Sequence, residues 1–246
     1  MGVSVGVTLE TMSTIDFGLS IFEIVVMLFA LSLHDCAQAW AANRLGDPTA
    51  KMMGRLTMNP MQHFDAFGTA LFPLIYVLRS PPFIMGWTKP VTMTAGNFRR
   101  MVRDETVAIL AGPAMQLVTA VLSLVTLMVL VRVNQGAAMS LQTAALLARR
   151  VPGVDTMDLP SIFPVVLLLY HCILINLLLF VFNLMPFPFF DGGKILVNFL
   201  PYNAAQTFQR MSMYFMIGFF FFGFAMVLTF FGPLMAIFNA LLGVRF

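Results

Sequence analysis

The residues best suited to chemistry lie in an apolar stretch near the N-terminus, where His34 and Asp35 are followed by Gln38. A helix that binds a hydrolytic zinc ion carries His-Glu-x-x-His, in which two imidazoles one turn apart hold the metal and the Glu serves as general base. Here the first His is present, Asp stands in place of Glu, and Gln stands in place of the second His. The pattern therefore indicates metal-dependent hydrolysis with two of its groups altered.

A second candidate group is Asp191, which follows a stretch rich in Phe and Pro. A carboxylate near a membrane is costly and usually has a partner. Pro186 and Pro188 interrupt a helix and favour an extended path. Gly192 and Gly193 permit a turn directly after the carboxylate. The pattern predicts an Asp held at a fixed depth and facing inward, and a helix-capping Asp at a membrane exit is the alternative.

The composition places these residues in a membrane. The chain has 246 residues, of which 59% are hydrophobic and 10% charged, and its mean hydropathy is +0.88. Soluble domains carry about 25% charged residues, so this chain is expected to be an integral membrane protein in contact with the lipid bilayer. The net charge of +3 is small, and nothing indicates nucleic acid as a partner. Cys36 and Cys172 both lie in apolar stretches, which argues against a disulfide framework.

Apolar stretches define the expected elements. Four of them are long enough to span a membrane as helices: residues 17–42, 107–131, 162–185 and 213–242. The shorter stretch 66–78 would reach about 20 Å as a helix, against a hydrocarbon core of about 30 Å. We therefore predict an all-α integral membrane protein with four long transmembrane helices and a short re-entrant or half-spanning segment. Residues 1–246 are expected to form a single domain, with residues 1–16 as an N-terminal tail without signal-peptide features.

The topology links the two candidate groups. His34 lies toward the C-terminal end of the first long stretch, and Asp191 lies just past the end of the third. Both ends face the same side if the segment 66–78 re-enters, and opposite sides if it crosses. With re-entry, most Lys and Arg residues fall on the shared side, which the positive-inside rule places in the cytoplasm. They are Arg44, Lys51, Arg55, Arg79, Lys89, Arg99, Arg100, Arg103, Lys194 and Arg210, against Arg132, Arg149, Arg150 and Arg245 on the other side.

Together the two motifs resemble those of the site-2 protease family of intramembrane zinc metalloproteases, in its compact bacterial branch. The Asn-x-x-Pro-x-x-x-x-Asp-Gly motif of that family is complete from Asn183 to Gly192. An Ala-Gly-Pro sequence at residues 111–113 also matches, although Gln116 stands where an Asn is usual. Further resemblances lie at residues 43–47, 54–55, 59–61, 63–65 and 86–91.

The resemblance implies roles for individual residues. In the family two His and one Asp bind zinc, and the Glu activates a zinc-bound water as general base. By position, His34 and Asp191 are metal ligands, and Gln38 takes the place of the second His although an amide suits zinc poorly. Asp35 takes the catalytic position but is one methylene shorter than Glu. Asn183 is expected to hold the substrate backbone.

The resemblance also implies where the protein works and on what. Expected partners are transmembrane segments of membrane-anchored regulatory proteins, in the bacterial inner (plasma) membrane with the site toward the cytoplasm. Residues 86–91 could offer an edge strand to an unwound substrate. His63 is expected to be a hydrogen-bonded interfacial residue and His171 a polar residue in helix packing, so neither replaces the missing ligand.

Three functional hypotheses remain open. The first is an active protease with an unusual zinc site, and the second is a pseudoprotease that binds membrane-protein partners without cutting them. The third is a small transporter that uses Glu23, Asp35 and Asp191 as a polar path. The complete motif around Asp191 argues against transport, which does not require that spacing. The chemistry of Asp35 and Gln38 predicts impaired or absent catalysis.

Overall fold

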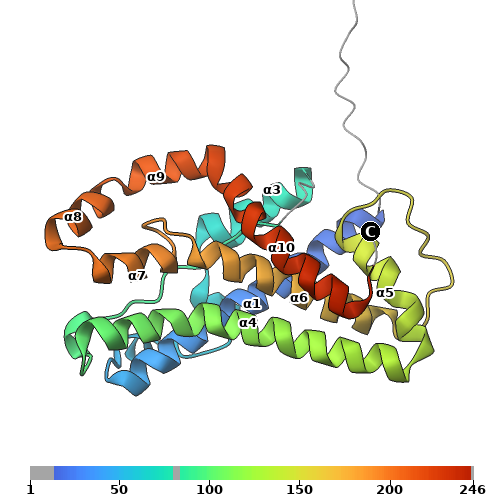
Figure 1. Cartoon of the computed structure of the whole chain (residues 1–246), viewed down its shortest axis with the longest axis horizontal. Helices are drawn as coiled ribbons and strands as arrows, with labels where there is room; N and C mark the ends of the chain where they lie inside the picture. Colours follow the sequence, from blue (N-terminus) through green and yellow to red (C-terminus); the bar gives the residue numbers. More distant parts are fainter. Residues whose placement is uncertain (1–13, 80–83, 245–246) are drawn as a thin grey trace, which may run out of the picture.

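The computed structural model describes residues 14–79 and 84–244, and this part of the chain is helical and contains no strand (Figure 1). The long helices are α1 (Thr14–Leu45), α4 (Met101–Val133), α6 (Phe163–Leu184) and α10 (Phe224–Leu242). Within the described residues, four helices are long and apolar enough to cross a membrane, and their candidate spans are Phe17–Leu45, Met101–Val133, Phe163–Leu184 and Phe221–Leu242. The predicted all-α class with four spanning helices is confirmed.

The last apolar stretch differs from the single uninterrupted helix expected over residues 213–242. It consists of α9 (Ser212–Gly218), a π-helical turn η4 (Phe219–Gly223) and α10. The π turn coincides with burial of the Phe219 ring, which packs edge-on against Phe182 and Phe190. One extra residue per turn locally rotates a helix face, and such turns commonly mark a bend. Helix α9 therefore arches away from the bundle before α10 descends beside α6 (Figure 1).

The core is built around α6, which contacts α1, α4, α5 (Gln135–Ala148) and α10. Helix α6 is mostly apolar, as expected for a helix packed against several others, and His171 and Asn176 are its buried polar exceptions. Its fully buried side chains include Val166, Ile173 and Leu177. Most of α6 is buried, although Val165 and Leu168 near its N-terminal end are exposed, and the Asp191 segment follows its buried C-terminal half.

Short elements frame the ends of the long helices. Residues 66–78 form the π-helical turn η2 (Ala66–Leu71) followed by α3 (Phe72–Arg79), and the carboxylate of Asp65 caps η2 by accepting from the backbone of Phe67 and Gly68. The segment is thus a short apolar helix, and its re-entry into a membrane stays a prediction. The remaining short helices are α2 (Thr49–Met52), η1 (Pro60–His63), η3 (Ala95–Asn97), α7 (Asp191–Phe199) and α8 (Tyr202–Arg210).

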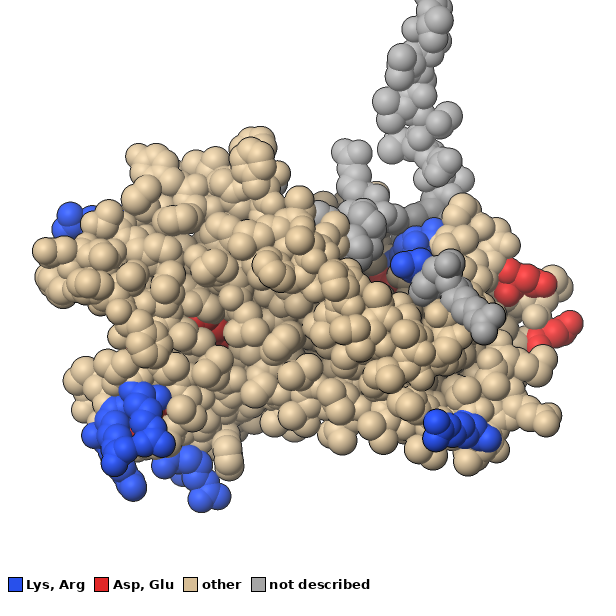
Figure 2. Space-filling view, viewed as in Figure 1, with Lys and Arg blue, Asp and Glu red and all other residues tan. Residues whose placement is uncertain are grey.

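Basic side chains are concentrated at the end of the bundle that holds α2 and the start of α4 (Figure 2). Asp47 organises the backbone there, because its buried carboxylate accepts from the Thr94 backbone at 2.7 Å and from the Asn97 amide at 2.9 Å. Burial alone would raise the pKa of Asp47, but these hydrogen bonds outweigh it and hold the pKa below its ordinary value. The carboxylate therefore stays ionised at the basic end.

Candidate functional site

Helix α1 carries three polar side chains into the interior. His34, Asp35 and Gln38 are 5%, 3% and 2% exposed, respectively. His34 and Gln38 are four residues apart and so lie on one face of the helix, one turn from each other. The spacing seen in the sequence therefore becomes a pair of side chains that face the same neighbour.

That neighbour is Asp191, the first residue of α7. The chain leaves α6 through the Pro-rich stretch and folds back on itself, so that a Cβ on Gly193 would lie 1.8 Å from the carbonyl oxygen of Phe187. Gly192 and Gly193 lie within α7 and do not form the turn that the sequence suggested. Both positions require glycine because neighbouring backbone atoms pack so closely that a Cβ would not fit.

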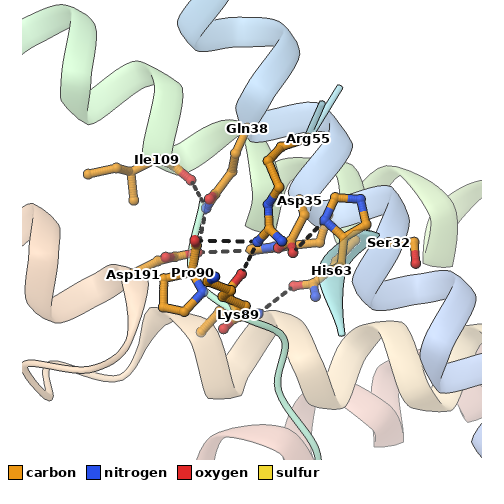
Figure 3. Close-up of polar contacts among 12 residues, drawn as sticks. Ser32, Asp35, Gln38, Arg55, His63, Lys89, Pro90, Ile109 and Asp191 are labelled. Carbon is orange, nitrogen blue, oxygen red and sulfur yellow. Dashed lines mark hydrogen bonds and ion pairs between the residues drawn. The ribbon is translucent and has the colours of Figure 1, made fainter. Parts of the chain in front are cut away.

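Three groups surround the carboxylate of Asp191, and Figure 3 shows one of them, the Gln38 side chain, pointing toward it. Its Oδ2 lies 2.9 Å from Nε2 of His34 and accepts a 2.7 Å hydrogen bond from the amide of Gln38. Its Oδ1 accepts from the ammonium of Lys194 at 2.8 Å. Burial opposes ionisation of Asp191, but His34 and Lys194 outweigh it, and the pKa of Asp191 lies below its ordinary value. The structure thus brings His34, Gln38 and Asp191 together, while their metal-binding roles stay predictions.

The orientation of the Gln38 amide is fixed by its neighbours. Its nitrogen donates both to Asp191 and, at 3.0 Å, to the carbonyl oxygen of Ile109 on α4. Both partners are acceptors only, so rotating the amide to exchange its oxygen and nitrogen would set oxygen against oxygen. The group at the second-His position therefore presents hydrogen atoms to the site.

Asp35 lies between two imidazoles. Its Oδ1 is 3.1 Å from Nδ1 of His34, and its Oδ2 is 3.1 Å from Nδ1 of His63. The second contact satisfies an ion-pair distance but not hydrogen-bond angles, so it is an electrostatic contact. Nε2 of His63 lies 2.8 Å from the backbone oxygen of Thr57. The hydrogen-bonded role expected for His63 agrees with this geometry, but its pairing with Asp35 was not foreseen.

Residues 84–94 form one wall of the site and have no regular secondary structure. Arg55 holds this wall, because its guanidinium donates to the backbone oxygens of Gln62 and Lys89. The backbone of Lys89 in turn donates to the carbonyl of His63 at 3.0 Å. Arg55 belongs to the resemblance at residues 54–55, but the sequence did not predict its contacts with this wall. The edge strand expected at residues 86–91 stays a prediction.

The close approach of α4 to α1 depends on Gly112. A Cβ at this position would lie 2.3 Å from Nε2 of His34. The following Pro113 lies inside α4 and removes one backbone donor from the helix. The Ala-Gly-Pro sequence thus has a local purpose, since it lets α4 pack directly on the imidazole.

A cavity of about 250 Å³ opens beside these groups. His34, Asp35, Gln38 and Asp191 all line it, opposite residues of the wall at 84–94. Half-buried Asn183 also lines it and donates to the side-chain oxygen of Gln116 at 3.3 Å. We call this cavity the cleft. The cleft cluster consists of the lining residues His34, Asp35, Gln38, Asp191 and Lys194, together with His63, which contacts Asp35 but does not line the cavity.

Comparison with known proteins identifies the family. Peptidase family M50 matches residues 22–226, which include most of α1, the residues that line the cleft, and α6. The chain belongs to peptidase family M50, the site-2 protease family of membrane metalloproteases. It is 29% identical over 180 residues to a Bacillus subtilis (strain 168) protein named "Putative zinc metalloprotease YwhC", covering 73% of this chain and 69% of that one. No solved structure matches significantly.

Peptidase family M50 implies zinc, and the donor chemistry of the cleft cluster tests that implication. Zinc binds His nitrogen, Cys sulfur and carboxylate oxygen, and catalytic sites use three protein ligands. Gln38 offers N–H donors in place of a lone pair, which leaves His34 and Asp191. Within residues 14–79 and 84–244, no group of three or more His, Cys, Asp or Glu is arranged to hold a metal ion. The residues present do not fit the zinc site that the M50 family implies.

A second polar cluster lies elsewhere in this M50 chain, around Glu23 of α1. The carboxylate accepts from Arg150 at 2.6 Å and from the hydroxyl of Tyr76, and it lies 3.2 Å from Nε2 of His171. None of these residues lines the cleft. We call Glu23, Tyr76, Arg150 and His171 the Glu23 cluster. Arg150 is the ionic partner that the buried Glu23 carboxylate requires. Glu23 therefore belongs to a different polar cluster from Asp35 and Asp191.

Proposed function

We propose that this M50 protein binds transmembrane segments of membrane-anchored regulatory proteins in its cleft and hydrolyses them poorly or not at all. The observation that carries the proposal is the Gln38 amide, whose N–H group donates to Asp191 where the family places an imidazole ligand. Hydrogen bonds to Asp191 thus take the place of the second imidazole ligand and of the positive charge of the metal. Loss of one zinc ligand removes the Lewis acid that lowers the pKa of the attacking water.

The cleft supports binding even where catalysis is lost. Its lining is largely apolar and includes Trp87, Leu179 and Phe182, which suits an unwound apolar segment. Asn183 lines the same cavity and is half-buried, so its amide can reach a substrate backbone. The family relationship supports the substrate class, since site-2 proteases act on membrane-anchored proteins.

The proposed setting is a bacterial inner membrane, with the cleft toward the cytoplasm. The Bacillus relative supports a bacterial source. The basic end near α2 and the start of α4 supports a cytoplasmic location for that end, because positive residues are retained inside. The cleft cluster lies toward this end of α1.

An active protease is the second candidate, and one observation favours it. Nε2 of His34 and Oδ2 of Asp191 lie 2.9 Å apart, so the two surviving ligand residues meet at one point. Asp35 also keeps a carboxylate at the general-base position, although it contacts His34 and His63. A shortened base misplaced by about 1 Å costs on the order of 10²-fold in rate.

One experiment separates these functions. The purified full chain is assayed for bound zinc, for cleavage of a model transmembrane substrate and for photo-crosslinking to it, beside the Asp35→Glu/Gln38→His double variant. We expect crosslinking in both proteins, with zinc and cleavage only in the double variant. Stoichiometric zinc with cleavage by the unmodified chain would establish the active protease, and absence of crosslinking in both would reject substrate binding.

A further inference from the structure

A second cavity adjoins the cleft beside α7, α8 and the start of α4. Its volume is about 220 Å³, and Gln38, Val91 and Lys194 line both cavities. Its other lining residues include Glu105 of α4 and Asn198 of α7. We call this cavity the polar pocket. It is smaller than the roughly 300 to 1,000 Å³ of a typical ligand site, so it suits one side chain of a ligand whose main part occupies the cleft.

The polar pocket differs from the cleft in the side chains that surround it. Glu105, Asn198 and Gln209 bring a carboxylate and two amides to it, whereas the cleft is lined largely by apolar and aromatic residues. The start of α4 lies with α7 and α8 at one end of the bundle (Figure 1). Basic side chains are concentrated at this end, which we propose to face the cytoplasm (Figure 2). A segment bound in the cleft therefore meets a polar environment on its cytoplasmic side.

Glu105 brings a negative charge to the polar pocket. It is half-buried and belongs to the candidate membrane span of α4, where an ionisable side chain is costly and commonly functional. Asn198 and Asp47 act electrostatically on its carboxylate, and neither carries a positive charge. Lys194 is the one cation among the described residues that line the pocket, and its ammonium is paired with Asp191. The Glu105 carboxylate is thus placed to receive a cation from a bound ligand.

The arginines at the start of α4 do not supply that cation. Arg99, Arg100 and Arg103 are exposed, and none of them lines the polar pocket. Arg103 and Glu105 are two residues apart on the helix, so their side chains do not face each other. Transmembrane segments, in contrast, commonly carry Lys or Arg at their cytoplasmic flank, as the positive-inside rule describes.

We propose that Glu105 recognises a Lys or Arg residue at the cytoplasmic flank of the transmembrane segment that the cleft binds. The inference rests on the proposed function, because the cleft must hold the apolar part of the segment for its flank to reach the polar pocket. The side-chain oxygens of Asn198 and Gln209 are further acceptors for the N–H groups of the cation. Glu105 is therefore a specificity residue, which decides which segments bind and takes no part in hydrolysis.

Binding of three synthetic transmembrane peptides to the purified full chain in detergent tests the proposal. The peptides share one apolar segment with a photoreactive residue and differ only in the pair of residues at each end, which is Lys, Gln or Glu. Fluorescence anisotropy measures the dissociation constant, and photo-crosslinking reports whether the peptide occupies the cleft. We expect the unmodified protein to bind the Lys peptide about threefold more tightly than the Gln peptide, as a partly exposed ion pair would give.

Variants of Glu105 should change this preference without weakening the cleft. Glu105→Gln should bind the Lys and Gln peptides equally, with the affinity of the unmodified protein for the Gln peptide. Glu105→Lys should favour the Glu peptide over the Lys peptide. Asp158→Asn is the matched control, since it also converts an acid to its amide, at an exposed residue that lines neither cavity, and it should keep the threefold preference. If Glu105→Lys fails to fold, the comparison of Glu105→Gln with Asp158→Asn decides the question.

Three results would overturn the proposal. Equal binding of the Lys and Gln peptides by the unmodified protein, with crosslinks in the cleft, would remove the role of Glu105 and leave the proposed function intact. Loss of the preference in both Glu105→Gln and Asp158→Asn would show a general effect of net charge. Absence of crosslinks from all three peptides would reject the proposed function and this inference with it.

Discussion

The cleft cluster and the Glu23 cluster both bury carboxylates between helices, but they differ in what surrounds them. The cleft cluster borders a cavity of about 250 Å³, whereas none of the residues of the Glu23 cluster lines it. Glu23 is enclosed by Tyr76, Arg150 and His171. A closed cluster can only stabilise the bundle, while one that faces a cavity can also contact a ligand. Burial of charge alone therefore does not identify the functional site.

The two clusters also neutralise their carboxylates differently. Glu23 pairs with a guanidinium whose side chain is 13% exposed. Asp191 pairs with the ammonium of Lys194, whose side chain is 35% exposed, and with two uncharged or titratable groups of α1. Water and salt screen a buried ion pair less than an exposed one. Breaking the Glu23 cluster should therefore cost more free energy of unfolding than breaking the cleft cluster.

The largest expected effect comes from breaking the Glu23 cluster. Arg150→Met leaves Glu23 buried without its cation and should lower the free energy of unfolding by about 3–5 kcal/mol. Chemical unfolding of the purified protein in mixed micelles measures this change. The Glu23→Leu/Arg150→Met double variant should recover part of the loss, because it removes both charges together. A loss below about 1 kcal/mol in Arg150→Met would show that the pair is exposed to water.

The next effect concerns zinc and only the cleft cluster. The Asp35→Glu/Gln38→His double variant should gain about 2.7 kcal/mol of stability at a free zinc concentration 100 times its dissociation constant. The unmodified chain should show no zinc-dependent shift, because Gln38 presents donors to the site. Thermal unfolding with zinc and with a chelator measures both. Equal stabilisation of the two proteins would contradict the interpretation that Gln38 closes the site to metal.

A smaller effect tests the packing that encloses the cleft cluster. Gly112→Ala places a methyl group on the His34 imidazole and should cost about 1–3 kcal/mol. Gly218→Ala is the matched control, since a Cβ there meets nothing within 4 Å and Ala favours helix by up to about 1 kcal/mol. Opposite signs in urea or thermal unfolding are expected. Stabilisation by both substitutions would show that α4 lies farther from His34.

Much of the fold and part of the cleft cluster could be predicted from the sequence. Hydropathy located the spanning helices, and the motif match together with the topology anticipated that His34 and Asp191 would meet. The Gln38 orientation could not be derived, because it depends on the Ile109 carbonyl of α4 and on the position of Asp191. Both contacts arise from packing between segments far apart in the chain.

Other features could not be predicted from the sequence because they also depend on contacts between segments far apart in the chain. The π turn at Phe219 coincides with aromatic packing against segments distant in sequence, and no local propensity signals it. The Asp35 contact with His63 depends on how η1 folds against α1. Glu23 was considered from the sequence as part of a polar path, and its pairing with Arg150 could not be predicted because Arg150 follows α5, far along the chain.

The smallest expected effect compares the two cations directly. Lys194→Met removes the ammonium from Asp191, and should cost about 0.5–1 kcal/mol because the side chain is partly exposed and the pair is screened by water. Asp191 keeps its contacts with His34 and Gln38, whereas Glu23 in Arg150→Met loses its strongest partner. Unfolding at low and high salt measures the difference, and only the Lys194 contribution should shrink with salt. A cost for Lys194→Met equal to that for Arg150→Met would mean that Asp191 is as deeply dependent on its cation as Glu23, and the cleft cluster would then be a structural ion pair.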